Sequence, residues 1–567
     1  MRQRPVVGLD DPRWQAYPEL IARLYAARAL RPEEGELALR QLAPPELGGL
    51  KAALELLAQA RAQQWRVLIC GDFDADGATA TALLVLALRA YGYERVDFRV
   101  PNRFSMGYGL SLALVDAIIA EGGCDLLITV DNGIASLEGV ARARRAGMRV
   151  LVTDHHLPGA SLPEADAIVN PNQPACPFAS KHLAGVGVAF YLVAALRTHL
   201  QNTLAQTYPS PTRWLDLVAL GTVADVVSLD HNNRILVEHG LRRLRAGECR
   251  PGLSALMRVA GLTPERLQAS DLGFYLAPRL NAVGRLEDMR LGIEFLLEES
   301  AVAAMAMAEE LDLLNKERRD IEAGMQAQAQ STLAKLDLGR PAQAAISLYE
   351  RNFHAGVIGI LAGRLKERYH RPVVVFADAE EAGEIKGSAR SIAGAHMRDL
   401  LAWIDAQSPG LILRFGGHAM AAGLSLRRAD LSRFDQQLQA AVQASCAATV
   451  FDRVLWHDGA LTAAQMNKAT ARLLAEAGPW GAGMPEPRFV GEFMVLEQRL
   501  LQERFLKMTL SGTEDNSVFD AIWFQPDLSC WPTAATRVRV LYALEVNHFR
   551  GRERLQLRIE AAQALPD

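Results

Sequence analysis

Short apolar runs alternate with longer mixed segments through the first third of the chain. The apolar runs have the length of β-strands and lie at 66–71, 96–101, 125–131 and 149–154. The segments between them have the length of helices and lie at 78–90, 110–121 and 136–146. Strands that alternate with helices predict a parallel, doubly wound sheet covered on both faces. A helical block at 184–260 is expected to follow it.

A second α/β domain is predicted after a long helix. The stretch at 298–336 lacks proline and is rich in Ala, Leu, Met, Glu and Gln, which favours helix, with Gly324 as its weak point. At ~1.5 Å per residue it could reach ~50–60 Å and join two domains, as one helix or as two. Apolar runs then resume at 344–350, 371–378 and 411–417, and this domain is expected to end near Cys446.

The last part of the chain changes to short strands separated by turns. The candidate strands lie at 489–500, 503–511, 517–524, 536–548 and 554–562. About five strands in so short a stretch predict a small antiparallel β-barrel, and an OB-fold is the best match. The predicted organisation therefore has five parts. They are an N-terminal segment (1–50), a first α/β domain (51–297), a connecting helix (298–338), a second α/β domain (339–446) and a barrel (447–567).

Composition narrows the class of protein. A chain of 567 residues is too long for one core, and its net charge of −4 means that nucleic-acid binding would depend on local basic patches. Six dispersed cysteines without a CxxC pair argue against a zinc ribbon or a disulfide framework and fit a reducing cytosol. The N-terminus lacks an apolar signal region, and no run approaches the ~18 apolar residues of a membrane span. We expect a soluble cytoplasmic monomer without a membrane partner.

The first strand leads into three alternate aspartates, Asp72, Asp74 and Asp76, followed by Gly77. Like charges this close are costly unless a cation lies among them, so a divalent metal with oxygen ligands is indicated. A polar turn is the plainer alternative. The EF-hand pattern is rejected, because Leu83 stands where a bidentate Glu is needed and the loop follows a strand.

Two other predicted strands end in metal-ligating residues. Asp131 ends one, and Asp154, His155 and His156 end the next. The carboxyl ends of parallel strands meet at one edge of a sheet, so these side chains should converge with the first aspartates. Asp225 lies in an apolar context where an unpaired charge would be costly, and could add a ligand. Such an oxygen-rich set suits Mn²⁺ or Mg²⁺, with enough carboxylates for two ions that share a ligand.

The segments GDFDADGATA, VDNG, TDHH and GTVADVV, in that order, resemble the motifs of the DHH phosphoesterase superfamily. The resemblance implies that Asp74 and Asp131 hold one ion, and that Asp76, Asp131, His155 and Asp225 hold the other. Asp154 and His156, with Asp72 nearby, would support the ligands or face the phosphate. Cys70 stands where many members have His, which leaves the first ion with fewer ligands or with help from Asp72.

The second α/β domain carries residues suited to phosphate binding, namely His354, Ser388, Arg390, Gly416, Gly417 and His418. Glycine N–H groups can bind phosphate oxygens, and Arg390 and His418 can add charge-assisted hydrogen bonds. The segment GGHAMAAG at 416–423 resembles the DHHA1 substrate-binding module. A P-loop is disfavoured because GxxxxGK[ST] does not occur, and Gly185-Val186-Gly187 does not follow a predicted strand as a dinucleotide motif would.

Three features together resemble the RecJ family of single-stranded-DNA exonucleases: DFDADGAT, PRLNAVGRL with Arg279 and Arg285, and a barrel after GPWGAGMPEPRF. Met484 stands where the family often has Asn. The resemblance implies metal-dependent 5′→3′ degradation of single-stranded DNA to mononucleotides in DNA repair, including mismatch repair, and in recombination. It places Arg279 at the catalytic site and Arg285 in substrate binding, and implies single-stranded-DNA-binding protein and a RecQ-type helicase as partners. The alternatives are a phosphodiesterase for short oligonucleotides and a catalytically silent DNA-binding relative.

Aromatic and basic residues of the predicted barrel are candidates for stacking on bases and following the DNA backbone. They are Phe505, Lys507, Trp523, His548, Phe549, Arg550 and Arg552. For Phe505 and Trp523, core packing is an equally good interpretation. The run at 548–554 is expected to be an exposed hairpin turn.

Overall fold

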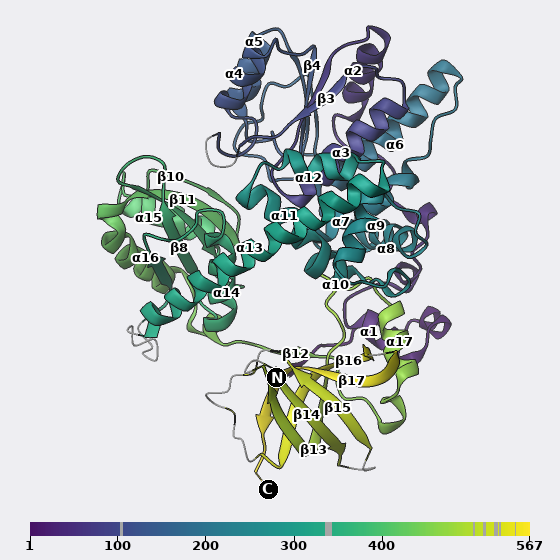
Figure 1. The fold of residues 1–567 in the computed structure, drawn as a ribbon, viewed down its shortest axis with the longest axis vertical. Helices are drawn as coiled ribbons and strands as arrows, with labels where there is room; N and C mark the ends of the chain where they lie inside the picture. The colour runs from purple at the N-terminus through teal and green to yellow at the C-terminus, as the bar shows by residue number, and fades with distance from the viewer. Residues whose placement is uncertain are drawn as a thin grey trace. The chain divides into compact units, whose positions relative to one another are not determined.

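A computed structural model of the chain describes residues 1–102, 106–334, 343–502, 505–513, 517–524, 526, 531, 535–549 and 551–566. The chain forms two compact units. The first contains Met1–Gly284, Asp288–Leu311 and Leu455–Asp567, and the second contains Arg285–Glu287 and Asp312–Val454. The N-terminal segment and the barrel therefore belong to the same unit as the first sheet (Figure 1).

The first unit is built on a parallel sheet whose strand order is β3-β2-β4-β5-β6. Its strands are β2 (Val67–Cys70), β3 (Val96–Arg99), β4 (Leu126–Val130), β5 (Arg149–Thr153) and β6 (Ala167–Val169). The predicted parallel sheet is confirmed. The residues of β2 and β4 are buried throughout, because helices cover both faces of the sheet. The three-residue strand β6 is too short to give a signal in the sequence.

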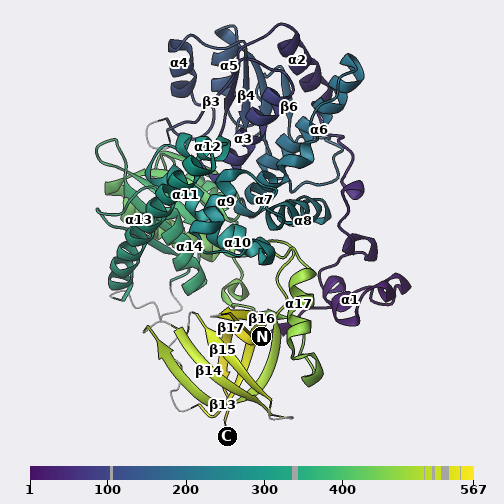
Figure 2. The same cartoon turned by 45° about the vertical axis from the view of Figure 1, so that its right-hand side comes forward.

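Helices pack on both faces of this sheet, with α4 and α5 on one side and α2, α3 and α6 on the other (Figures 1 and 2). Their bounds are Leu50–Ala62 for α2, Ala75–Ala90 for α3, Leu112–Ala120 for α4, Leu137–Arg145 for α5 and Gly185–Leu204 for α6. Helix α3 starts three residues earlier than expected, because Asp74 caps it by accepting a 3.0 Å hydrogen bond from the Gly77 N–H.

The predicted helical block extends well past residue 260. It contains α7 (Leu215–Ala224), α8 (His231–Arg245), α9 (Pro251–Val259), α10 (Ala269–Asp271), a π-helix at Leu272–Leu276, α11 (Ala277–Leu286) and α12 (Arg290–Leu297). The segment PRLNAVGRL therefore lies within α11. Within the described ranges, every helix is too short or too polar to cross a lipid bilayer.

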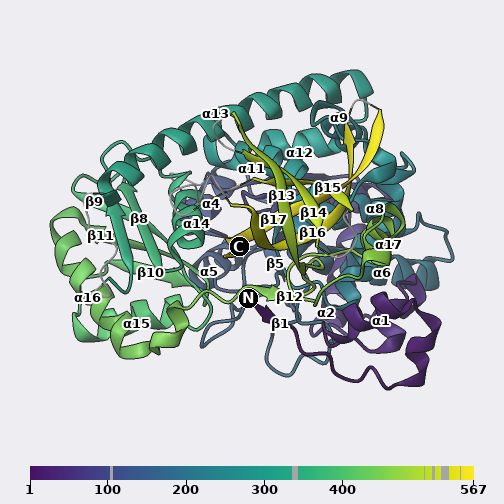
Figure 3. The same cartoon turned by 90° about the horizontal axis from the view of Figure 1, so that it is seen from below.

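The connecting stretch is one helix, α13 (Ala301–Ala334), which runs without a break from the first unit into the second (Figure 3). Gly324 does not interrupt it. A Cβ at this position would meet no atom within 4 Å, so the glycine lies on an open face where it costs only helix propensity.

The second unit contains a mixed sheet with the strand order β10-β11-β9-β8-β7. Its strands are β7 (Ile346–Tyr349), β8 (Val373–Asp378), β9 (Glu384–Arg390), β10 (Arg414–Gly417) and β11 (Ala421–Arg427). Only the β7–β8 pair is parallel among the pairings of this sheet. The predicted apolar run at 411–417 contains β10, whereas β9 and β11 were not predicted as strands, and the phosphate-binding candidates at 386–391 and 416–423 lie in or next to these three strands. The helices are α14 (Ile358–Tyr369), α15 (Met397–Gln407) and α16 (Leu431–Ser445).

The C-terminal strands close into a five-stranded barrel in the order β13-β14-β15-β17-β16. They are β13 (Phe489–Leu501), β14 (Phe505–Gly512), β15 (Val518–Trp523), β16 (Arg537–Phe549) and β17 (Arg552–Ala564). The predicted barrel is confirmed, with one difference: β15 and β17 pair in parallel, and the other pairs are antiparallel. Helix α17 (Lys468–Glu476) packs beside β16.

The N-terminal segment is attached to the residues that lead into the barrel. Strand β1 (Arg2–Gln3) pairs in parallel with β12 (Trp456–His457). After α1 (Glu19–Ala26), the Arg28 guanidinium lies 3.1 Å from the Asp458 carboxylate, and both side chains are buried. A buried pair of this kind holds its two segments in one relative position, because separating them would leave a charge unpaired.

Candidate metal centre

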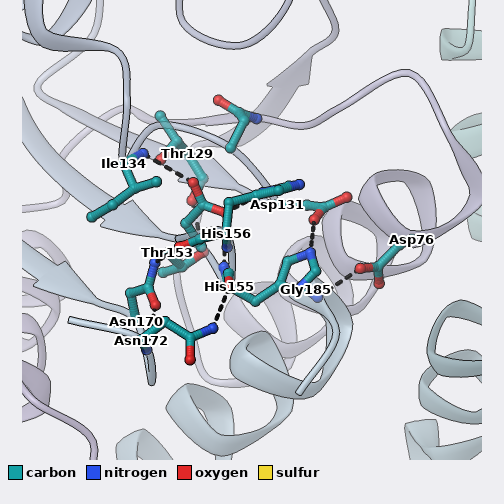
Figure 4. Close-up of polar contacts among 12 residues, drawn as sticks. Asp76, Thr129, Asp131, Ile134, Thr153, His155, His156, Asn170, Asn172 and Gly185 are labelled. Atoms are coloured by element: carbon teal, nitrogen blue, oxygen red, sulfur yellow. Dashed lines mark hydrogen bonds and ion pairs between the residues drawn. The ribbon is translucent and has the colours of Figure 1, made fainter. Parts of the chain in front are cut away.

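The ends of three adjacent parallel strands bring acidic and imidazole side chains together. Asp72 follows β2, Asp131 follows β4, and Asp154, His155 and His156 follow β5. Asp131 has a φ of +62°, a conformation that Asp tolerates better than most residues, and Gly133 completes the turn. The convergence expected from the sequence is therefore present (Figure 4).

Asp225 reaches the same cluster from the C-terminal end of α7. Its carboxylate lies 3.5 Å from His155 Nε2, and the Asp131 carboxylate lies 3.0 Å from the same nitrogen. Ligand atoms within 4.8 Å of one another define three groups: Asp76, His155 and Asp225; Asp72, Asp74 and Asp131; and Asp131, His155 and His156. All the expected ligands thus lie in one place, with Asp131 and His155 each in two groups.

The cluster fits divalent metal ions. Among the residues that the structure describes, no hydrogen bond reaches the buried Asp131 Oδ1, although it lies 3.0 Å from His155 Nε2. Burial, reinforced by neighbouring carboxylates, raises the pKa of Asp76 to about 7 and the pKa values of Asp131 and Asp225 well above their usual range. A cation would relieve this cost, and oxygen donors with one imidazole suit Mn²⁺ or Mg²⁺.

Asp154 supports the cluster through hydrogen bonds. Its Oδ1 lies 2.7 Å from His156 Nδ1 and accepts from the His155 N–H, and its Oδ2 accepts from the Ile134 N–H. Burial is the largest influence and would raise the pKa of Asp154, but the hydrogen bond and charge of His156, the charge of His155 and the Ile134 N–H together outweigh it and lower that pKa. Burial would likewise lower the pKa of His156, and Asp154 raises it to about 9. In the metal-free protein, His156 is therefore mostly protonated at neutral pH.

The start of α6 holds Asp76 in place. The N–H groups of Gly185 and Val186 donate to its carboxylate at 2.6 and 2.9 Å, as the unpaired amides of a helix N-terminus can (Figure 4). A Cβ on Gly185 would lie 2.6 Å from Asp131 Cβ, so glycine is needed there. The sequence pattern drew attention to Gly185 only as part of a dinucleotide motif, and this role was missed.

Asparagines that were also missed from the sequence hold the ligand-bearing backbone. The side-chain amides of Asn170 and Asn172 donate to the carbonyls of His156 and His155 at 2.9 and 2.6 Å. Asn281 of α11 accepts a 2.8 Å hydrogen bond from the Ala75 N–H. A lone Asn carries no metal signal in a sequence, and only the contact reveals it.

Cys70 lies outside the ligand groups found among the described residues, and the two predicted arginines donate to backbone carbonyls. Cys70 is buried at the end of β2, and burial raises the pKa of its thiol. Arg279 is buried in α11 and donates to the Tyr275 carbonyl at 2.6 Å. Arg285 donates to the Gly356 carbonyl at 2.9 Å, within the second unit.

In the second unit, the predicted substrate-binding residues gather around β9, β10 and the start of α14. Ser388 and Arg390 lie on one face of β9. The start of α14 packs closely against both side chains, since a Cβ on Gly359 would lie 2.9 Å from Ser388 Oγ and 3.1 Å from Arg390 Nη2. Gly416 pairs with Gly423, which pairs with Ser388. The remaining positions are Gly417 at the end of β10, His418 in the turn to β11, and His354, whose Nδ1 accepts from the Gly356 N–H and whose pKa burial lowers.

On the barrel, the predicted DNA-binding residues divide into exposed and buried positions. Arg552 is exposed at the start of β17, and Lys507 Nζ lies 3.9 Å from the Asp520 carboxylate. Trp523 is buried against Trp531, which favours its core-packing interpretation, and Phe505 packs edge-on against Phe524. His548 pairs with Glu553 across the β16–β17 hairpin. The Phe549 side chain and Arg550 lie outside the described residues.

Replacement of Gly185 by alanine should weaken metal binding. The added methyl group would push Asp131 away and shift the two N–H groups that hold Asp76. Displacing groups that orient metal ligands costs about 10–100-fold in affinity. Titration with Mn²⁺ measures this, with Gly187→Ala as the control in the same helix, where the nearest atom is in a flexible Leu183 side chain. Equal affinity in Gly185→Ala and the parent protein would contradict the role of Gly185.

Comparisons with known proteins agree with this architecture. Residues 66–222 match the DHH family, N-terminal domain; residues 342–445 match the DHHA1 domain; and residues 457–561 match the RecJ OB domain. The chain is 50% identical to the single-stranded-DNA-specific exonuclease RecJ of Dickeya dadantii (strain 3937), over 99% of this chain and 98% of that protein.

Two solved structures are similar along the whole chain. The RecJ of Thermus thermophilus in complex with Mn²⁺ is 30% identical, with a TM-score of 0.80 over 100% of this chain and 80% of that one. The same protein in complex with Mg²⁺ is 29% identical, with a TM-score of 0.74 over 100% and 79%.

Proposed function

We infer that the chain, which belongs to the RecJ family, is a metal-dependent exonuclease specific for single-stranded DNA. The observation that carries this inference is that Asp74, Asp76, Asp131, His155 and Asp225 all lie within one cluster, with Cys70 as the one departure from the motifs. A catalytically silent relative would be expected to lack some of these ligands. The cofactor is Mn²⁺ or Mg²⁺.

We propose that two ions bind, with Asp131 as the shared ligand. Asp76, His155 and Asp225 would complete one set, and Asp72 and Asp74 the other. Bound metal ions supply a water of lowered pKa and neutralise charge on the phosphate under attack. The protein's own residues then have two tasks, which are to hold the ligands in place and to orient the phosphate.

His156 is the group best suited to contact the phosphate. Its hydrogen bond to Asp154 keeps the imidazole protonated and fixes its orientation, so its other nitrogen can donate to a phosphate oxygen. The Tyr108 hydroxyl lies 3.4 Å from His156 Nε2 and adds a second polar group there. Arg279 is proposed to act on the same substrate from α11.

The second unit is proposed to bind a phosphate of the DNA strand. Ser388 and Arg390 lie side by side on β9, next to glycines that leave the backbone of β10 and β11 accessible. Arg390 can form paired, charge-assisted hydrogen bonds to a phosphate. His354, Arg285, Gly416, Gly417 and His418 are proposed to complete this surface.

The barrel is proposed to bind the part of the single strand that lies outside the metal centre. Lys507 and Arg552 would contact the backbone and Phe505 a base, as OB-folds do with single strands.

We further propose that the enzyme is a cytoplasmic monomer, that its roles lie in mismatch repair and recombination, and that it works with single-stranded-DNA-binding protein and a RecQ-type helicase.

End-blocked strands test the proposed activity and its direction. A labelled single strand blocked at its 3′ end should be degraded to mononucleotides with Mn²⁺ or Mg²⁺, and the same strand blocked at its 5′ end or paired in a blunt duplex should persist. Degradation from the 3′ end would refute the proposed 5′→3′ direction. Faster turnover of a dinucleotide than of the long strand would favour the oligonucleotide phosphodiesterase, and binding without cleavage would favour the silent relative.

A further inference from the structure

The turn that carries Asp225 is strained. Asp225 ends α7, and the next residue, Val226, has a φ of +60°. A β-branched residue is rarely found in this left-handed conformation, because its side chain crowds the backbone. Such a conformation persists only where the surrounding structure holds it. The position of Asp225 therefore depends on what holds residues 226–229.

The Val226 side chain does not hold the turn. It is 70% exposed and borders a cavity of about 400 Å³ that Phe274 and Trp480 also line. Two hydrogen bonds fix the backbone that follows instead. Asn233 Nδ2 donates to the Ser228 carbonyl at 2.9 Å, and the Leu229 N–H donates to the Ala482 carbonyl at 2.7 Å.

The acceptor of the second hydrogen bond, the Ala482 carbonyl, belongs to a tight loop at 481–484 (GAGM) just before the barrel. Gly481 and Met484 close the loop with two backbone hydrogen bonds of 2.8 and 3.1 Å. Gly483 has a φ of +71° and lies against Ser228, so closely that a Cβ there would be 1.9 Å from Ser228 Oγ. A Cβ on Gly481 would lie 2.8 Å from Leu229 Cδ1. The 481–484 loop thus packs directly on the residues after Asp225.

The same loop is anchored on its other side by the N-terminal segment. Arg28 Nε donates to the Pro485 carbonyl at 2.7 Å, and its guanidinium stacks 5.0 Å from the centre of the Trp480 ring. The Tyr25 hydroxyl donates to the Ala477 carbonyl at 2.8 Å. These contacts make the 481–484 loop a fixed support, because it cannot move away from Ser228 without breaking buried hydrogen bonds.

We propose that the 481–484 loop is a positioning element for the metal centre, which holds Asp225 in its ligating place through Ser228 and Leu229. This inference rests on the proposed role of Asp225 as a metal ligand. Metal sites tolerate ligand displacements of only about 0.2 Å, and groups that orient ligands change affinity by about 10–100-fold. The 481–484 loop, which precedes the barrel, would then affect how tightly the cluster at the ends of β2, β4 and β5 binds metal.

Gly483→Ala tests the proposal, with Gly247→Ala as the matched control. Gly247 has the same φ of +71°, but a Cβ there meets no atom within 4 Å, so the control carries the backbone strain without the collision. Titration of the full-length, metal-stripped proteins with Mn²⁺, read from the electron paramagnetic resonance signal of free Mn²⁺, should show affinity about 10-fold weaker in Gly483→Ala. Gly247→Ala should bind like the parent protein. Parental affinity in Gly483→Ala would overturn the proposal.

A second substitution separates the collision from general damage. Ser228→Gly removes the atoms nearest the new methyl group, so the double variant Gly483→Ala with Ser228→Gly should recover most of the affinity. A double variant as weak as Gly483→Ala would overturn the proposed route through Ser228. Should Gly483→Ala not fold, Arg28→Lys tests the same support, because it keeps a cation beside Asp458 but loses the Nε hydrogen bond to the Pro485 carbonyl, and parental affinity in that variant would overturn the proposal.

Asp225→Ala distinguishes this inference from the proposed function. It should weaken Mn²⁺ binding at least as much as Gly483→Ala does. If Asp225→Ala binds Mn²⁺ like the parent protein, the ligand role of Asp225 is wrong. If Asp225→Ala weakens binding and Gly483→Ala does not, only the positioning role of the 481–484 loop is wrong.

Discussion

Asp76→Asn is expected to abolish the release of nucleotides from single-stranded DNA, by about 10³-fold or more at saturating Mn²⁺ or Mg²⁺. Asn has nearly the shape of Asp and can still accept a hydrogen bond from Gly185 or Val186, so the fold around it should persist. It lacks the negative charge that a divalent ion requires of the group formed with His155 and Asp225. The loss should therefore lie in metal binding and catalysis.

The same substitution should not destabilise the metal-free protein. Burial makes a charged Asp76 costly, and the neutral amide removes that cost. Thermal melting in a chelator should give a midpoint equal to or above that of the parent protein at pH 7.5. Nucleotide release is measured with a 3′-blocked, labelled strand, and Asp116→Asn is the control, since Asp116 is an exposed partner of Arg142. Release by Asp76→Asn within tenfold of the parent rate would contradict its ligand role.

The sequence could predict those parts of the site that depend on short local patterns of consecutive residues. Buried strands such as β4 end in Asp131, and the carboxyl ends of parallel strands share an edge, so the convergence followed from local patterns alone. Gly185 and Asn281 could not be predicted in this way. Each makes a hydrogen bond to a residue more than 100 positions away, and neither stands in a metal-ligand pattern of the sequence.

The second unit shows a different limit of sequence reasoning. Strand β9 alternates buried Ile385, Gly387 and Ala389 with partly exposed polar residues, which is the pattern of a strand. Its glycine, serine and alanine make the apolar side weak, so the sequence gives no clear strand signal there. Gly387 is small because Phe376 and Leu424 fill the space above it, and only the folded sheet shows that packing.

Removal of metal should make the stability of the protein fall as pH rises. The pKa of Asp76 is about 7 in the folded protein, and near 3.9 when unfolded. Between these values the folded state keeps a proton that the unfolded state has released, so the contribution of Asp76 is complete below pH 4 and is lost as pH rises through about 7. The raised pKa values of Asp131 and Asp225 act in the same direction.

Of the two supporting residues, His156 adds to this fall and Asp154 does not affect it in that range. The pKa of His156 is raised to about 9, so its contribution is present below about pH 6.5 and is lost as pH rises toward 9. The pKa of Asp154 is lowered, so its contribution is lost only at acidic pH, below its ordinary value. Between pH 5 and pH 9 the cluster therefore destabilises the metal-free protein with increasing pH, by several kcal/mol in total as an order of magnitude.

Bound Mn²⁺ should reverse this dependence. Metal binds the deprotonated ligands, so its affinity rises with pH, and its stabilisation grows with the ratio of free metal to dissociation constant. Melting midpoints in a chelator should fall by on the order of 5 °C from pH 5.5 to pH 8.5, and the increase caused by Mn²⁺ should be larger at pH 8.5. Asp76→Asn, which cannot titrate at that position, should show a smaller fall in the chelator. An equal fall in both proteins would mean that Asp76 does not hold the proton assigned to it.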